Sequence, residues 1–167
     1  FRHNGFRNRI FAVDSSPAML SRLRDNLAAY SQQTPIRVLQ EDIRGVDLTG
    51  AGVVALNLTL QFLPPEDRIG LLRRVAQSLV PGGALFLTEK VRLPTSELDS
   101  LVREMHHEFK HAQGYSWTEI AQKAASIKNV MQVDTLEEHK TRLRDAGFSR
   151  VKIWHRHFNF LSILAER

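Results

Sequence analysis

Two carboxylates and one amide lie where an open sheet binds ligands. Asp14, Asp42 and Asn57 each lie at or near the end of a short apolar run. Ligands of parallel sheets bind beyond the carboxyl ends of the strands, so the three side chains should meet at one edge. A carboxylate there can accept hydrogen bonds from both hydroxyls of a ribose, and an acid or amide one strand over can meet the amine of adenine. This pattern favours a nucleotide site, with Asn57 bonding the cofactor or a substrate group.

The same acids have a purely structural alternative. Asp14 precedes Ser15-Ser16-Pro17 and can cap the helix that starts there, while Asp42 can shape a turn. Neither acid alone distinguishes the two interpretations. The occurrence of all three polar residues on successive strand–helix units favours the nucleotide site.

Strands that alternate with helices would position these residues. The sequence Ser15-Ser16-Pro17 predicts the start of one helix, with a serine as its cap, Pro64-Pro65 the start of another, and Pro81-Gly82-Gly83 a turn. The predicted strands are short apolar runs: Arg9–Asp14, Ile36–Gln40, Val53–Leu58 and Ala84–Thr88. This alternation predicts an α/β protein with a parallel sheet that helices cover on both faces.

The pattern changes after Glu89. Three further helices are predicted, at Ser96–Lys110, Thr118–Ile127 and Thr135–Ala146, the last closed by Gly147. Two final strands, Arg150–His155 and Phe158–Leu164, follow each other too closely for a crossover helix and must be antiparallel. We expect one domain over residues 1–167, with a helical insertion at about 93–131 that covers the ligand edge.

Composition is that of a globular protein. The chain has 167 residues, 43% of them apolar and 25% charged, with a net charge of +5. It has no cysteine, which excludes a disulfide framework and a thiolate metal site and fits a cytoplasmic protein. No apolar run approaches the ~20 residues that span a bilayer, and no signal peptide is visible. The sequence therefore predicts neither a membrane protein nor a resident metal.

Two motifs resemble class I S-adenosylmethionine-dependent methyltransferases. Residues 12–20, AVDSSPAML, resemble their acidic-loop motif, and residues 79–85, LVPGGAL, resemble the turn before their fifth strand. The resemblance implies a Rossmann-like fold, a mostly parallel sheet with a C-terminal antiparallel strand pair. The Gly-rich loop of such a site should precede Asp14, so we expect the first βα units to lie outside this chain.

Narrower strings closely resemble one subfamily, carboxy-S-adenosyl-L-methionine synthase. These are residues 57–63 (NLTLQFL), 105–110 (MHHEFK), 114–116 (GYS), 129–131 (NVM) and 158–160 (FNF). The resemblance covers nearly the whole chain. It implies an enzyme that converts S-adenosylmethionine and prephenate to carboxy-S-adenosylmethionine and phenylpyruvate, through a sulfonium ylide that captures carbon dioxide. A second enzyme then uses the product to modify the wobble uridine of tRNA.

The resemblance also assigns residues. It implies that Asp14 and Ser15 hold the ribose, Asp42 and Ile43 the adenine, and Asn57 the reactive end of S-adenosylmethionine. At Ser15 the family more often has asparagine. It further implies a homodimer.

One departure from the family is larger. After Gln122-Lys123 the family has an arginine that pairs with the added carboxylate, whereas this chain has Ala124, which has no donor. Lys123 or Lys128 could substitute as point charges. A diverged methyltransferase acting on another small molecule is therefore the alternative function, and a non-catalytic binding protein is a third hypothesis.

Other charged and aromatic residues are weaker candidates. Lys90, Lys110 and Lys123 could attract an anionic substrate, and Tyr115 or His107 could line its pocket, although surface lysines are usually only solvated. A metal pair of His107 with His111 lacks a third ligand. The basic N-terminal region contains no known nucleic-acid module, so we expect small-molecule chemistry without direct nucleic-acid binding.

Overall fold

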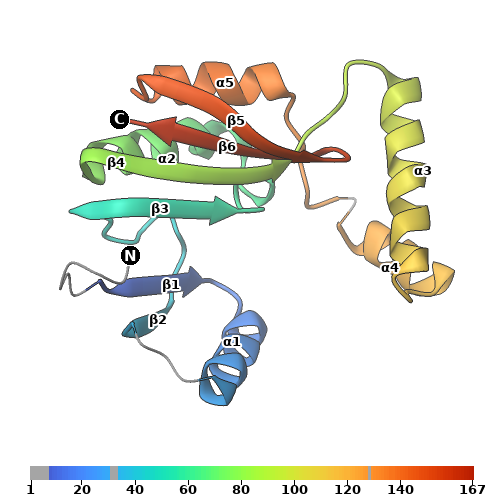
Figure 1. Cartoon of the computed structure of the whole chain (residues 1–167), viewed down its shortest axis with the longest axis horizontal. Coiled ribbons are helices and arrows are strands. Elements are labelled where there is room, and N and C mark those ends of the chain that lie inside the picture. Colours follow the sequence, from blue (N-terminus) through green and yellow to red (C-terminus); the bar gives the residue numbers. More distant parts are fainter. Residues whose placement is uncertain (1–7, 31–33, 128) are drawn as a thin grey trace. The chain divides into compact units, whose positions relative to one another are not determined.

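The fold was analysed in a computed structural model that describes residues 8–30, 34–127 and 129–167. The chain divides into two compact units, residues 1–47 and residues 48–167 (Figure 1). Each unit has its own sheet.

The first unit is a strand–helix–strand motif. β1 (Ile10–Asp14) and β2 (Ile36–Gln40) pair in parallel, and α1 (Pro17–Ala29) joins them. The side chain of Ser16 accepts a hydrogen bond from the N–H of Met19, and Pro17 occupies the first turn. These contacts confirm the predicted start of the helix, because a hydroxyl at this position satisfies a free N–H group.

The second unit contains a four-stranded sheet of order β3-β4-β6-β5 (Figure 1). β3 (Ala51–Asn57) and β4 (Leu79–Lys90) are parallel, whereas β6 (Phe160–Glu166) is antiparallel to both β4 and β5 (Arg150–His157). The predicted antiparallel pair at the C-terminus is confirmed.

One face of this sheet is covered by two helices, α2 (Pro65–Ser78) and α5 (Leu136–Asp145), which also contact each other. The fully buried side chains of the helices include Leu72 and Leu143. The sheet contributes alternate residues to this core: Val54, Leu56, Leu85, Leu87, Leu161, Ile163 and Ala165. The period of two places these side chains on one face, and their burial drives the docking of the helices.

β4 begins earlier than predicted. Its pairing with β3 already includes Leu79, and it resumes at Ala84 after an irregularity. Gly82 within this irregularity has a φ of +77°, and a Cβ on Gly83 would lie 2.9 Å from the carbonyl oxygen of Val80. The Pro-Gly-Gly sequence thus forms a kink inside the strand, where a side chain at Gly83 would collide with the backbone.

The predicted helical insertion contains α3 (Ser96–Ala112) and α4 (Trp117–Ile127). Figure 1 shows both helices beyond the end of the four-stranded sheet. No residue of α3 is buried, and α3 contacts the β5–β6 hairpin through aromatic side chains, with Phe109 5.6 Å from Phe158 between ring centroids. No helix in the described part of the chain is long and apolar enough to cross a membrane.

A cluster of charged side chains fixes the segment before α5. Asp134 Oδ2 lies 2.6 Å from a guanidinium nitrogen of Arg68 and 2.6 Å from one of Arg142. Arg68 is 1% exposed and also donates to the carbonyl oxygens of Leu63 and Gln132. The buried arginine therefore joins the start of α2 to the loop that leads to α5.

Candidate functional site

The two strand-end acids of the first unit lie at the same end of its sheet. Asp14 is the last residue of β1, and its carbonyl oxygen accepts the N–H of Glu41, the residue before Asp42. Because β1 and β2 are parallel, both acids follow the carboxyl ends of their strands. This is the end of a parallel sheet at which ligands bind, and the roles of Asp14 and Asp42 in holding a ribose and an adenine stay predictions.

Both acids also make local hydrogen bonds. Asp14 Oδ1 accepts the N–H of Ser16 at 2.8 Å, and Asp42 accepts the N–H of Arg44 at 2.9 Å. Hydrogen bonds from Arg44, whose guanidinium lies 2.6 Å from Asp42, lower the pKa of Asp42 to about 2. The turn-forming role is therefore real, and the same bonds orient both side chains at the strand ends. Next to them, Ser15 is exposed.

Asn57 ends β3 in the second unit and is followed by a tightly held loop. Leu58 has a φ of +55°, which is uncommon for a residue with a side chain. The next residues form the short helix η1 (Leu60–Phe62). The carboxylate of Glu89 accepts the N–H groups of three consecutive residues of this loop, at 2.9, 2.7 and 3.2 Å: Thr59, Leu60 and Gln61.

Glu89 itself is 2% exposed. Burial raises its pKa to about 7, while the three N–H donors and Arg68 act in the opposite direction and favour the carboxylate.

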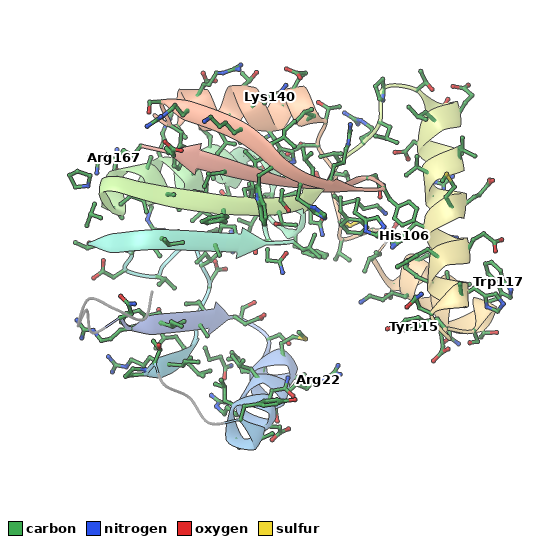
Figure 2. All side chains as sticks on the ribbon, viewed as in Figure 1. Arg22, His106, Tyr115, Trp117, Lys140 and Arg167 are labelled. Carbon is green, nitrogen blue, oxygen red and sulfur yellow. The ribbon has the colours of Figure 1, made fainter. Side chains whose placement is uncertain are left out.

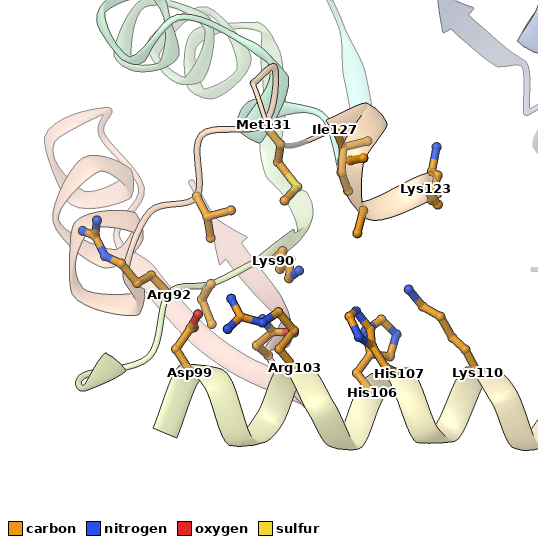
Figure 3. A pocket seen from close by; sticks show the side chains of 15 residues that line it. Lys90, Arg92, Asp99, Arg103, His106, His107, Lys110, Lys123, Ile127 and Met131 are labelled. Carbon is orange, nitrogen blue, oxygen red and sulfur yellow. The ribbon is translucent and has the colours of Figure 1, made fainter. Parts of the chain in front are cut away.

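A cavity of about 460 Å³ lies in the second unit between α3, α4 and the end of β4 (Figure 3). Among the described residues, five cationic side chains line it: Lys90, Arg92, Arg103, Lys110 and Lys123. Asp99, the one acid among the described lining residues, accepts the N–H of Leu93. The excess of positive charge makes the cavity suitable for an anion.

Burial and repulsion between neighbouring positive charges lower the pKa values of Lys90 and His106 in this cavity. Burial and the charge of Lys110 lower the pKa of Lys90. Burial, together with both lysines, lowers the pKa of His106 to about 4, so this imidazole is neutral at pH 7. The ring of His106 packs 5.3 Å from Phe158 and 5.2 Å from Phe160. A bound anion would relieve the repulsion between the lysines.

The opposite wall of the cavity is apolar. Figure 3 shows Met131 and Ile127 facing the side chains that extend from α3. Val133, Ala124 and Ala125 also line the space. A hydrophobic wall opposite a cationic one suits an organic anion rather than a bare inorganic ion.

The predicted substrate residues are only partly brought together. Lys123 lines the cavity with Lys90 and Lys110. Tyr115 lies instead in the turn between α3 and α4, 56% exposed, outside the lining residues (Figure 2). Lys128 lies outside the described residues. The binding roles of these residues stay predictions.

Sequence reasoning missed Arg103, His106 and Glu89. The helical spacing of Asp99, Arg103, His106 and Lys110 signals a common face of α3, and all four line the cavity. His107 also lines the cavity, whereas His111 stacks on Trp117 at 4.5 Å. Among the described residues no group of three potential metal ligands occurs.

Comparison with known proteins identifies relatives over almost all of the chain. Residues 1–83 match the family described as "Methyltransferase domain". The chain is 48% identical over 157 residues to a carboxy-S-adenosyl-L-methionine synthase of Photorhabdus laumondii, covering 94% of this chain and 62% of the relative. It is 48% identical over 165 residues to the synthase of Cronobacter sakazakii, covering 99% of this chain and 66% of the relative.

Solved structures share the fold at low sequence identity. Human N-acetylserotonin methyltransferase in complex with SAM has a TM-score of 0.61 and 17% identity, over 98% of this chain and 41% of that one. PhzM, a pyocyanin biosynthetic protein, has a TM-score of 0.66 and 16% identity, over 95% of this chain and 43% of that one. The α/β methyltransferase fold, with parallel and antiparallel strands, is confirmed, and the chain spans under two thirds of the length of the synthases of P. laumondii and C. sakazakii.

Proposed function

The chain belongs to the carboxy-S-adenosyl-L-methionine synthase family, and from this membership we propose that the whole protein is a transferase that uses S-adenosylmethionine. Its substrates would be S-adenosylmethionine and prephenate, and its products carboxy-S-adenosylmethionine, phenylpyruvate and water. The water forms from the hydroxyl group that leaves prephenate and the proton that leaves the sulfonium methyl. The product would serve tRNA wobble-uridine modification. The observation that carries this proposal is the 48% identity over 94% of the chain.

The strand-end residues supply the proposed nucleoside contacts. Asp14 and Ser15 would hold the ribose, and Asp42 and Ile43 the adenine. The ionised Asp42, with its pKa lowered to about 2, remains an acceptor across the physiological pH range. Asn57 would contact the reactive end of S-adenosylmethionine.

The cationic cavity supports an anionic second substrate. Prephenate carries two carboxylates and an apolar ring, and the cavity offers cationic side chains opposite an apolar wall. Lys90, Lys110 and Lys123 would attract the carboxylates, while Met131 and Ile127 would pack against the ring. The positive electrostatic potential of the cavity would also steer an anion towards it and raise its rate of association.

One observation favours a second candidate, a diverged methyltransferase. Ala124 lines the cavity where the family carries an arginine, and its methyl group cannot pair with a carboxylate. Lys123, its neighbour in α4, also lines the cavity. The synthase reaction would then depend on lysines in place of a bidentate arginine.

A homodimer, as the family resemblance implies, has support from α3. Leu98, Leu101 and Met105 recur at helical spacing and are 42%, 53% and 51% exposed. A second copy would cover this apolar stripe. We further propose a cytoplasmic protein that acts on small molecules and does not itself contact nucleic acid.

The test is to incubate the full-length protein with S-adenosylmethionine and prephenate and to follow both products by mass spectrometry. Phenylpyruvate and carboxy-S-adenosylmethionine in equal amounts would support the synthase. Formation of S-adenosylhomocysteine with a methylated acceptor, without either product, would favour the methyltransferase.

A further inference from the structure

The end of β4 holds the loop after β3 through a side chain. Glu89 Oε1 accepts the N–H groups of Thr59 and Leu60, and Oε2 accepts that of Gln61. Glu89 is 2% exposed, so these bonds replace almost all of its contact with water. A carboxylate is costly to bury, and three aligned N–H donors are what make this position tolerable.

The loop held in this way has an unusual backbone. Leu58, directly after Asn57, adopts a φ of +55°, and its N–H donates to the carbonyl oxygen of Thr88 at 2.7 Å. Residues with a side chain rarely adopt this conformation, so the surrounding contacts must maintain it. The bonds to Glu89 begin one residue later, at Thr59.

The same loop is tied to two further segments. Gln61 is 6% exposed, and its side-chain oxygen accepts the N–H of Lys90. Its carbonyl oxygen accepts the N–H of Gln132, in the segment between α4 and α5. The loop is therefore fixed from several sides, with Glu89 supplying three of the bonds.

We infer that Glu89 is a positioning residue, whose carboxylate fixes the loop after β3 so that Asn57 is presented to the S-adenosylmethionine-derived ligand. The inference rests on the proposed role of Asn57. Glu89 acts through backbone amides and does not touch the ligand. Lys90, which lines the cavity, has a second support in the pairing of β4 with β6.

The variant Glu89→Gln tests the inference in the full-length protein. The glutamine side chain has one oxygen and one NH₂ group in place of two carboxylate oxygens. The NH₂ group is a hydrogen-bond donor and would face a backbone N–H of the loop, which is also a donor. Leu143→Ala serves as a control, since Leu143 is fully buried on α5 and its truncation destabilises the fold without touching the loop. Both variants are compared with the unmodified protein in three measurements: affinity for S-adenosylhomocysteine by calorimetry, affinity for phenylpyruvate, and hydrogen exchange of individual amides.

In Glu89→Gln we expect affinity for S-adenosylhomocysteine to fall about tenfold, equivalent to ~1.4 kcal/mol. Exchange should accelerate at the amides of residues 59–61, and affinity for phenylpyruvate should stay within twofold. Leu143→Ala should leave both affinities unchanged at temperatures where it is folded. Glu89→Asp should restore part of the nucleoside affinity.

The inference is overturned if Glu89→Gln binds S-adenosylhomocysteine as tightly as the unmodified protein, or if both variants lose affinity equally. Failure of the unmodified protein to bind this nucleoside would instead contradict the proposed function. In that case hydrogen exchange still tests whether Glu89 holds the loop. Unchanged exchange at the amides of residues 59–61 in Glu89→Gln would show that the carboxylate does not hold it.

Discussion

Glu89 and Lys90 are neighbours at the end of β4, yet they serve different parts of the second unit. The Glu89 carboxylate accepts N–H groups of the loop after Asn57, whereas the Lys90 side chain lines the cationic cavity. Successive side chains of a strand point to opposite faces, so one strand end supports both features. The loop after Asn57 and the cationic cavity thus have a common support in β4.

Removing one cation from the cavity should weaken binding of the anionic substrate. For Lys110→Met we expect the KM for prephenate to rise about tenfold, with an unchanged KM for S-adenosylmethionine, because a charge-assisted bond is lost. Lys152→Met is the matched control, since Lys152 is exposed on β5 and does not line the cavity. Steady-state kinetics with each substrate varied in turn measures both constants. Equal effects of the two variants would contradict an anion-binding role for the cavity.

Adding an arginine at residue 124 should strengthen retention of a carboxylate. Ala124 lines the cavity, so Ala124→Arg places a planar donor pair inside it. We expect affinity for carboxy-S-adenosylmethionine to rise about tenfold, measured by calorimetry. Ala121→Arg, an exposed position on α4 outside the lining residues, should have no effect. A lower affinity in Ala124→Arg would show that this wall does not face the carboxylate.

Neutralising Asp134 should destabilise the second unit. Its carboxylate pairs with Arg68, which is 1% exposed, and with Arg142. For Asp134→Asn we expect a loss of about 3 kcal/mol in the free energy of unfolding, because a buried guanidinium loses its counter-charge. Urea unfolding followed by circular dichroism measures it, with Asp145→Asn on the exposed side of α5 as the control. A loss below about 1 kcal/mol, the size typical of a surface pair, would contradict the structural role.

Acid should destabilise the protein partly through His139. This side chain is 2% exposed, neither ring nitrogen has a hydrogen-bond partner among the described residues, and burial lowers its pKa to about 4. The unfolded chain, with an ordinary value of 6.5, binds more protons between these two values, so the free energy of unfolding falls as pH drops from 6.5 towards 4. His139→Leu should flatten this part of the stability curve, measured by thermal unfolding at a series of pH values.

The pKa of His106 is also lowered to about 4. Protonation of His106 should therefore add to the loss of stability of the unmodified protein between pH 6.5 and pH 4. The difference between the unmodified protein and His139→Leu isolates the contribution of His139. His155→Leu, the same substitution at an exposed position of β5, is measured beside it as the control. An identical slope in His139→Leu and the unmodified protein would contradict the burial argument.

The strands and helices could be predicted because local signals mark them. Ser16 and Pro17 start α1 as expected, and the apolar run before Asp14 is β1. The kink at Pro81-Gly82-Gly83 was less predictable, since only pairing with β3 shows that β4 begins before it. Local sequence does not show whether a strand begins to pair before or after a turn-forming sequence such as this one.

The candidate site was predictable to the extent that it depends on strand ends. Asp14 and Asp42 lie at one end of a parallel pair because parallel strands place their carboxyl ends together. Glu89 could not be found in this way, because its three partners are backbone amides almost thirty residues earlier in the chain. The cavity also required the packing of α3 against the hairpin, which follows from contacts such as Phe109 with Phe158.

The most direct test of the account follows one carbon atom. The full-length protein is incubated with S-adenosylmethionine and prephenate that carries ¹³C in its ring carboxylate, and the nucleoside product is analysed by mass spectrometry. The account predicts that the label appears in the new carboxyl group of carboxy-S-adenosylmethionine. Label found only in dissolved bicarbonate, with S-adenosylmethionine unchanged, would contradict it.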